Sequence, residues 1–305
     1  MRPAHSVTVS NTFQAMYKGC VMSIEDTYIT KGVNVSTGDI NYGGAVIVNG
    51  DVTDNMKVIA KGNVTINGYV ESAYIHSDGD IIINGGATGK IHDEDCRLIA
   101  GGSIHIEHAQ GLDIIAGNKL TVAKQLAYSR VNARGGVRVG SGKKPMGSLF
   151  ACSIHCGKTL TAGSLGAISG SVLLIDFSEQ YNVICNRLDE LESLHKKLSS
   201  TSHKHEHKLV EINRHQMPNF LANKLHALTE ELNAEHKLLA WLFDAKLDMQ
   251  KSKSEYERGI GVLANNELFP GVTVKLNERV WRTEREYQRC EIALDTGVWQ
   301  MSALA

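Results

Sequence analysis

Residues 98–139 read LIAGGSIHIEHAQGLDIIAGNKLTVAKQLAYSRVNARGGVRV, and this stretch decides the fold because one phrase recurs in it. The phrase is an apolar pair, a small residue, a glycine turn and then alternating apolar residues. The small residues of successive copies along the chain are Ala60, Ser77, Ala100, Ala116, Ala133 and Cys156. The steps between them are 17, 23, 16, 17 and 23 residues. A period near 17, with two insertions of about six residues, predicts a solenoid.

Each copy also holds a short strand in which every second residue is apolar. These strands are 46–48, 64–66, 81–83, 104–106, 120–122 and 137–139. Asn-Gly pairs follow three of them and could close local hairpins. However, one glycine turn per coil in constant register favours coils that stack in parallel and bury their apolar faces against each other. We therefore predict a mainly β fold, with a parallel β-helix over residues 39–175.

The hand of this helix has two interpretations. Valines recur every six residues at Val46, Val52, Val58, Val64 and Val70, which is the rhythm of left-handed hexapeptide helices. The rhythm fails at residue 76, and bulky residues often follow the valines. These departures favour a right-handed helix.

Residues 176–258 differ in composition from the repeat, because they contain no glycine and are rich in leucine, lysine, glutamate and histidine. Apolar residues there step by four and three, which is a heptad pattern, although an imperfect one. The first series is Ile184, Leu188, Leu191, His195 and Leu198. The second series is Leu221, Leu225, Leu228, Leu232, Glu235, Leu239, Leu242, Lys246 and Met249. Pro218 lies between the two series and cannot sit inside a helix without loss of a hydrogen bond, so we predict a long antiparallel coiled-coil hairpin.

The two flanks of the chain contain further strand patterns. Residues 1–38 are predicted to be an N-terminal cap or the remnant of a preceding domain. Residues 259–305 alternate again, and their strands are expected to pack back on the β-body. Caps at both ends are expected because an open solenoid exposes edge strands.

Composition excludes several classes of function. A net charge of −1 gives no reason to expect nucleic acid as a partner. No apolar run approaches the roughly 20 residues that span a bilayer. No apolar segment follows the N-terminus as in a secretory signal, so a cytoplasmic location is expected. Six scattered cysteines do not resemble a disulfide framework.

The succession of elements resembles the flagellar assembly protein A (FapA) family of bacteria. The resemblance rests on the glycine-turn coils, the leucine-rich hairpin, and segments 36–40 (STGDI), 269–272 (FPGV) and 285–287 (REY). It implies a right-handed parallel β-helix interrupted by a coiled coil, and a cytoplasmic, non-enzymatic role in flagellar assembly or placement. Family members usually carry a longer N-terminal domain, and almost nothing precedes the repeat in this sequence, so the resemblance does not extend to any function housed in that domain.

Candidate metal and catalytic residues are few, and we predict no catalytic, cofactor-binding or metal site. Cys152 and Cys156 could suggest zinc, but a strand would place both on the core face with Ile154. His203 and His207 are four residues apart on a helix and could share a metal, although an exposed polar helix is the simpler account. Because a hairpin tip is exposed, we predict partner binding there, through His203, His207, His215 and Phe220.

The predicted function is a scaffold with protein partners, flagellar or regulatory, and with possible self-association through the coiled coil. One alternative is a polymerising cytoskeletal scaffold, against which the predicted caps argue. The other is a carbohydrate-active or acyl-transfer enzyme, which needs converging acids or a histidine ladder. The acids at 93–95 lie in a single insertion loop. His76, His105 and His155 fall at different phases of the repeat.

Overall fold

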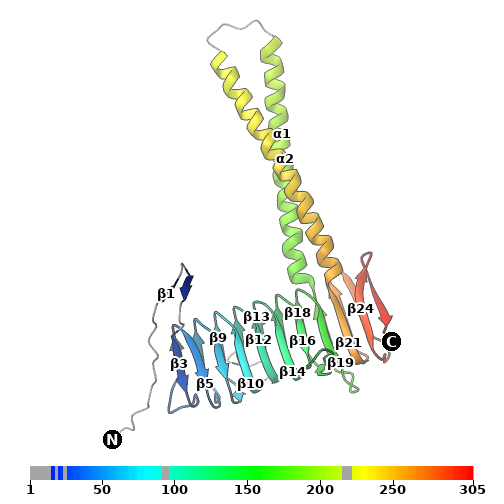
Figure 1. Cartoon of the computed structure of the whole chain (residues 1–305). Helices are drawn as coiled ribbons and strands as arrows, with labels where there is room; N and C mark the ends of the chain where they lie inside the picture. Colours follow the sequence, from blue (N-terminus) through cyan, green and yellow to red (C-terminus); the bar gives the residue numbers. More distant parts are fainter. Residues whose placement is uncertain (1–14, 18–19, 23–25, 91–95, 215–221, 305) are drawn as a thin grey trace. The chain divides into compact units, whose positions relative to one another are not determined.

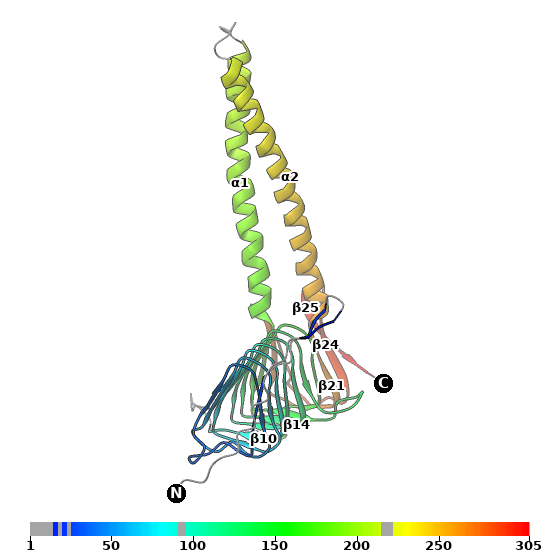
Figure 2. The same ribbon diagram turned by 60° about the vertical axis from the view of Figure 1, so that its left-hand side comes forward.

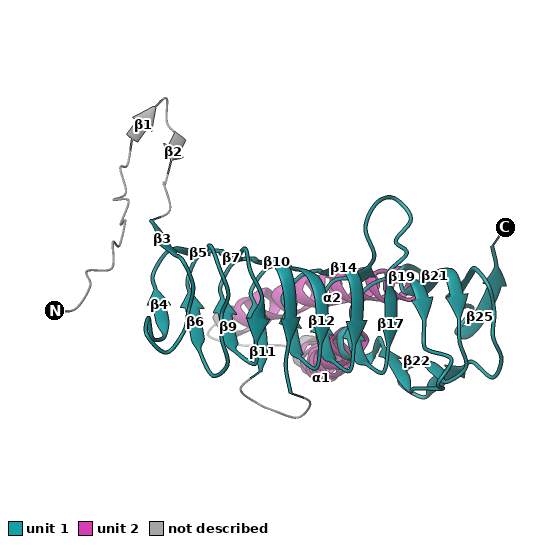
Figure 3. Ribbon diagram, turned by 90° about the horizontal axis from the view of Figure 1, so that it is seen from below, with its two compact units in different colours: residues 1–180, 258–305 teal, residues 181–257 magenta. Residues whose placement is uncertain are grey.

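The computed structural model describes residues 15–17, 20–22, 26–90, 96–214 and 222–304. The chain divides into two compact units, which Figure 3 colours separately. One comprises residues 1–180 and 258–305 and contains the strands, and the other comprises residues 181–257 and contains most of the two helices. A short antiparallel pair, β1 (Ala15–Tyr17) and β2 (Cys20–Met22), forms a sheet of its own.

The first unit is a β-solenoid built from two long sheets, with the coils stacked one behind another (Figures 1 and 2). The larger sheet contains β3 (Thr27–Thr30), β5 (Ala45–Val48), β7 (Val64–Ile66), β8 (Val70–Glu71), β10 (Ile81–Thr88), β12 (Ile104–Gln110), β14 (Leu120–Ala127), β16 (Val137–Val139), β17 (Ser148–Phe150), β19 (Leu160–Leu165), β21 (Gly261–Leu268), β24 (Cys290–Asp295) and β25 (Val298–Ala303). The other contains β4 (Ile40–Tyr42), β6 (Lys57–Ala60), β9 (Tyr74–Ser77), β11 (Arg97–Ala100), β13 (Asp113–Ala116), β15 (Arg130–Ala133), β18 (Ser153–Cys156), β20 (Leu173–Asp176), β22 (Val272–Leu276) and β23 (Arg279–Arg282). Neighbouring strands are parallel from β3 to β21 and from β4 to β22, which confirms the predicted parallel solenoid.

The small residues that anchor the repeat form one column through the second sheet. Ala60, Ser77, Ala100, Ala116, Ala133 and Cys156 pair in succession across six neighbouring strands. All six are buried. The turn that follows is equally tight, because a Cβ on Gly117 would lie 2.0 Å from the carbonyl oxygen of Gly101 in the coil beside it. The column needs small residues, and the turn needs glycine, because successive coils approach closely at both.

Each coil has a third side that the sequence did not reveal as a strand. In β10 the register with β12 shifts between Ile83 and Gly86, so the strand bends and its second half pairs with β8. In the first coils this side is reduced to the bridges of Val52 with Val33 and Val70. The five valines that recur every six residues therefore fall on successive sides of the coil. All five side chains are buried. The right hand stays a prediction.

The solenoid begins earlier than we expected. Strand β3 pairs with β5 in parallel, from Thr27 opposite Ala45 to Thr30 opposite Val48, so it belongs to the first coil. It lies inside the segment 1–38, which we predicted to be a cap or the remnant of a preceding domain. Its four residues show no apolar alternation. The pairing across coils is what assigns the strand to the solenoid.

At the other end, the stack continues after the helices. Strand β21 pairs in parallel with β19, and β22 pairs in parallel with β20. The chain then reverses, because β23 is antiparallel to β22, and β24 and β25 are antiparallel to each other. The ring of Trp299 on β25 packs against Phe177 at 5.8 Å between centroids, which closes the core at this end.

The second unit is an antiparallel pair of long helices, α1 (Ser178–Arg214) and α2 (Ala222–Gly259) (Figure 1). Glu192 meets Lys246 and His205 meets Glu235, so residues late in α1 contact residues early in α2. The predicted seam positions are buried or half-buried on both helices wherever their side chains are described. The antiparallel hairpin is thus confirmed, while Pro218 and Leu221 lie outside the described residues. In the described part of the chain, neither helix is apolar enough over a sufficient length to cross a bilayer.

Candidate interaction sites

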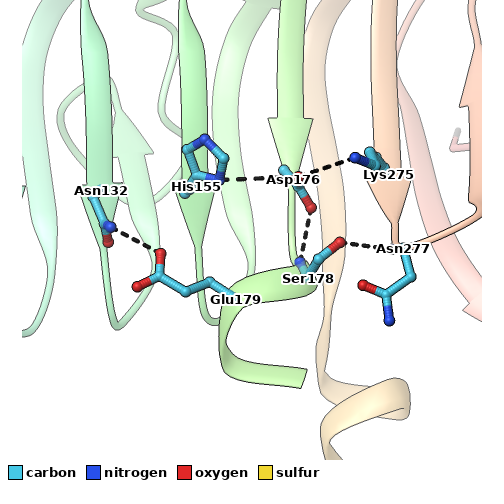
Figure 4. Close-up of polar contacts among 7 residues, drawn as sticks. All are labelled: Asn132, His155, Asp176, Ser178, Glu179, Lys275 and Asn277. Atoms are coloured by element: carbon cyan, nitrogen blue, oxygen red, sulfur yellow. Dashed lines mark hydrogen bonds and ion pairs between the residues drawn. The ribbon is translucent and has the colours of Figure 1, made fainter. Parts of the chain in front are cut away.

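The first turn of α1 is fixed by a polar cluster on the last coils of the solenoid (Figure 4). Asp176 is buried, and its Oδ1 accepts the backbone N–H of Ser178 at 2.8 Å. The hydroxyl oxygen of Ser178 accepts the backbone N–H of Asn277 at 2.6 Å. A carboxylate at a helix N-terminus satisfies an otherwise unpaired N–H and interacts favourably with the helix dipole.

Four further side chains complete this cluster. The other oxygen of Asp176, Oδ2, lies 3.7 Å from Lys275 Nζ and 3.9 Å from His155 Nδ1. Glu179 in the first turn of α1 accepts a hydrogen bond from the side-chain amide of Asn132 at 2.8 Å. Asn132, His155, Asp176 and Lys275 pair in succession along one column, so parallel strands bring together residues that are far apart in the sequence.

The geometry of this cluster suits a structural role better than a catalytic one. A catalytic histidine–aspartate pair needs a hydrogen bond of about 2.6–3.2 Å, which is shorter than the 3.9 Å between His155 and Asp176. The oxygen of Asp176 that forms a hydrogen bond is taken by the start of α1.

The prediction that the repeat histidines fall at different phases of the coil was partly wrong. His76 and His155 share one outward column, with Ile99, Ile115 and Asn132 between them, because strand pairing absorbs the insertions that separate them. They are still four coils apart, or about 19 Å at the usual strand spacing, so they cannot share a ligand. His105 lies on the other sheet. The acids at 93–95 lie outside the described residues.

The two cysteines of the predicted core face are indeed buried, with Ile154 between them. Burial raises the pKa of the Cys152 thiol from 9.0 to about 12. Burial also raises the pKa of the Cys156 thiol, and the nearby carboxylate of Asp176 adds to the effect. Both thiols are therefore held in the protonated form and pack as small apolar core residues.

The predicted partner-binding residues of the hairpin fall into two groups. His215 and Phe220 lie outside the described residues. His203 and His207 are exposed, and their rings face different carboxylates: His203 is 3.6 Å from Glu206, and His207 is 3.5 Å from Glu211. This arrangement does not support a metal shared between His203 and His207. Their role in partner binding stays a prediction.

The residue of this segment that points into the seam is His205. Its Nδ1 lies 2.9 Å from Oε1 of Glu235 on α2. Both side chains are largely buried. Glu231, one turn before Glu235, brings a second carboxylate to the same place. The signal in the sequence was the heptad step, which continues from Leu198 through 202 to 205 and so places His205 in the seam rather than His203 or His207.

Helix α2 also carries exposed apolar side chains next to its buried seam residue Leu242. Leu238 and Trp241 lie one turn apart on one side, and Phe243 and Leu247 lie one turn apart on the other. Trp241 is 61% exposed and Phe243 is 58% exposed. Large aromatic side chains at this exposure on a solvated helix are typical of a protein-binding surface.

A family model described as the flagellar assembly protein A β-solenoid domain matches residues 26–298, which covers every coil and the hairpin. No curated protein and no solved structure matches the chain.

Proposed function

The chain belongs to the FapA family, and from this premise we propose that it is a non-enzymatic scaffold that acts through protein partners in bacterial flagellar assembly or placement. The single observation that carries the scaffold part is the pair of exposed apolar rows on α2, Leu238 with Trp241 and Phe243 with Leu247. The flagellar part rests on the family alone. The proposed place of action is the cytoplasm.

The proposed partner surface accepts a helix. The two rows flank the seam of α2, so an added helix would cover one row and continue the knobs-into-holes packing of the hairpin. Aromatic side chains dominate the energy of such contacts, because each buries a large rigid surface. Trp241 and Phe243 are therefore the expected anchors.

The polymerising scaffold is less well supported. Stacking of solenoids end to end needs open edge strands in parallel orientation. At the C-terminal end the parallel stack gives way to the antiparallel strands β23, β24 and β25, which cover the last coil. The catalytic alternative finds no support in the cluster around Asp176, whose hydrogen bond is used to begin α1.

The test is affinity capture from the lysate of a flagellated bacterium, with identification of the captured proteins. The full chain is compared with the double variant Trp241→Ala/Phe243→Ala. The matched control is Leu194→Ala/Val210→Ala, which removes exposed apolar side chains from α1. We expect flagellar components to be captured by the full chain and the control and to be lost with the first variant.

Two results would count against the proposal. If the captured proteins contain no flagellar component, the flagellar role is wrong. If both variants capture the same flagellar components as the full chain, the rows on α2 are not the binding surface. A second possibility is that α2 of another copy covers these rows. Sedimentation of the purified chain tests this, because it measures whether the chain associates with itself.

A further inference from the structure

We propose that His205, Glu231 and Glu235 form a binding site for a divalent first-row transition metal that joins α1 to α2. One ligand atom from each of the three side chains lies within 4.8 Å of the other two. His205 comes from α1, and both glutamates come from α2, so an ion held by all three cross-links the helices. All three residues belong to the helical unit.

The spacing of the donor atoms fits a small ion. His205 Nδ1 and Glu235 Oε1 are 2.9 Å apart. In a tetrahedral site with bonds of about 2.0–2.1 Å, neighbouring ligand atoms lie about 3.3 Å apart. A shift of a few tenths of an ångström would therefore admit the ion. Rotation of the exposed Glu231 side chain would bring the third donor into place.

Burial leaves one of these oxygens without a partner. Glu235 Oε2 is inaccessible to solvent and accepts no hydrogen bond from the described residues. A buried carboxylate oxygen that lacks a hydrogen bond destabilises the fold, because nothing compensates for its loss of solvation. A bound cation would satisfy this oxygen, either by direct coordination or by neutralising the carboxylate to which it belongs.

The charges of the two glutamates also favour a bound cation. Glu231 and Glu235 are four residues apart on α2, so the two carboxylates lie on the same face and repel each other. The His205 ring lies against only one of them, with Nδ1 2.9 Å from Oε1 of Glu235. A divalent ion removes the repulsion and compensates both charges.

A simpler account is a polar layer that fixes the register of the two helices. Polar seam residues do serve this purpose in coiled coils. A His205–Glu235 hydrogen bond would be enough for it, but that account leaves Oε2 of Glu235 buried without a partner among the described residues. The metal site accounts for this oxygen.

The donor set restricts the class of ion. Imidazole favours zinc, iron, nickel and copper over magnesium and calcium, and carboxylates are accepted by zinc, manganese and iron. One histidine with two glutamates is a donor set of the zinc type, with a fourth position for water. Zn²⁺ is therefore the probe, and Co²⁺ is its spectroscopic substitute.

A metal at this site would make the pairing of the two helices beyond His205 depend on the bound ion. Beyond His205 the seam of α1 has one more described apolar position, Leu209, and the seam of α2 before Glu235 has Leu225, Leu228 and Leu232. The ion would add a cross-link between the two helices in this half of the hairpin.

The experiment is calorimetric titration of the full chain with ZnCl₂ after removal of bound metals, together with the visible spectrum of the Co²⁺ form. The test variants are His205→Gln, Glu235→Gln and Glu231→Gln. The matched control is the double variant His203→Gln/His207→Gln, which removes two exposed histidines on either side of the site. Circular dichroism at the helical minimum checks that each variant is folded.

We expect one Zn²⁺ per chain and a tetrahedral Co²⁺ spectrum. Each test variant should bind at least about tenfold more weakly, while the control binds as the full chain does. Glu231 is exposed, so Glu231→Gln tests the site without altering the packed seam. The proposal is overturned if the chain binds no Zn²⁺, or if all three test variants bind Zn²⁺ as tightly as the full chain does.

Discussion

Ala133 and Cys156 stand opposite each other in register on neighbouring coils, although 23 residues separate them. Ala116 and Ala133 stand in the same relation across only 17 residues. The additional residues of the longer coil therefore leave the stack, as the loop before β17 does, and they do not disturb the core. Register is set by the close approach at the small residue and at the glycine that follows.

Replacement of Gly117 by alanine should destabilise the solenoid by about 1–3 kcal/mol, because the added Cβ would lie 2.0 Å from the carbonyl oxygen of Gly101. Urea unfolding, followed by the signal of the β-sheets, measures the change. Gly43→Ala is the matched control, since a Cβ there meets no atom within 4 Å. Equal stability of the two variants would contradict the close packing of the turns.

Replacement of Asp176 by alanine should lower the free energy of unfolding by about 1–3 kcal/mol, because Ser178 loses its buried hydrogen-bond acceptor. Lys275 also loses its counter-charge, and His155 loses the carboxylate beside it. Asp176→Asn keeps an acceptor and should lie between this variant and the wild type. Asp189→Ala, at an exposed position on α1, serves as the control and should change stability by less than about 0.5 kcal/mol. A loss no larger than that of the control would refute the role of Asp176.

The thiols of Cys152 and Cys156 should resist alkylation by iodoacetamide at about pH 8 in the folded chain and react in guanidinium, because the thiolate is the reactive form. Burial raises the pKa of Cys152 to about 12, and it raises that of Cys156 too. Cys185, which is half-buried on α1, should react faster than either in the native protein. Mass spectrometry of the peptides measures each site separately.

The same raised pKa values predict how stability depends on pH. A folded-state pKa above that of the unfolded chain means that the unfolded chain releases its proton first as pH rises. The contribution of Cys152 is therefore complete below pH 9.0 and is lost as pH rises toward about 12. Cys152→Ala should make the free energy of unfolding decline less steeply with pH in this range. An unchanged profile would exclude Cys152 as the cause of the decline.

The double variant His205→Leu/Glu235→Leu should stabilise the metal-free hairpin by about 1–4 kcal/mol, because a well-packed apolar pair replaces two buried polar groups. Thermal melting followed at the helical minimum of the circular dichroism spectrum measures this. His207→Leu/Glu211→Leu replaces an exposed pair and should change little, since exposed ion pairs contribute about 0–1 kcal/mol. A lower melting temperature in the first variant would show that the polar pair is itself stabilising.

Periodicity in the sequence was enough for the parallel stack and for the hairpin. The column from Ala60 to Cys156 and the heptad series from Ile184 to Leu198 are found where the spacing places them. These features are local, because each side chain follows from its neighbours at a fixed interval. Strand β3 was missed as a coil because a single strand of four residues has no period of its own.

Contacts between distant segments could not be predicted in this way. Asn132 and Glu179 are 47 residues apart, and Ser178 and Asn277 are 99 apart. Their meeting depends on how many coils lie between them and on where the strands resume after the hairpin. The seam position of His205 could have been found by extending the heptad count beyond Leu198. The carboxylates that face it required the register of α1 against α2.

The return of the stack after the hairpin also bears on folding kinetics. Leu160 on β19 must find Val262 on β21 across an excursion that includes both helices. Loop-closure entropy grows only by about 0.6 kcal/mol per doubling of length, so an excursion of about 80 residues costs about 1.2 kcal/mol more than one of about 20. If the helices pair first, even that difference shrinks, because their early association brings the two strands together. Without early pairing of the helices, about 1.2 kcal/mol on the barrier would slow this step by nearly tenfold. Pairing of the helices is therefore what lets the last coil accept insertions of different lengths at this point.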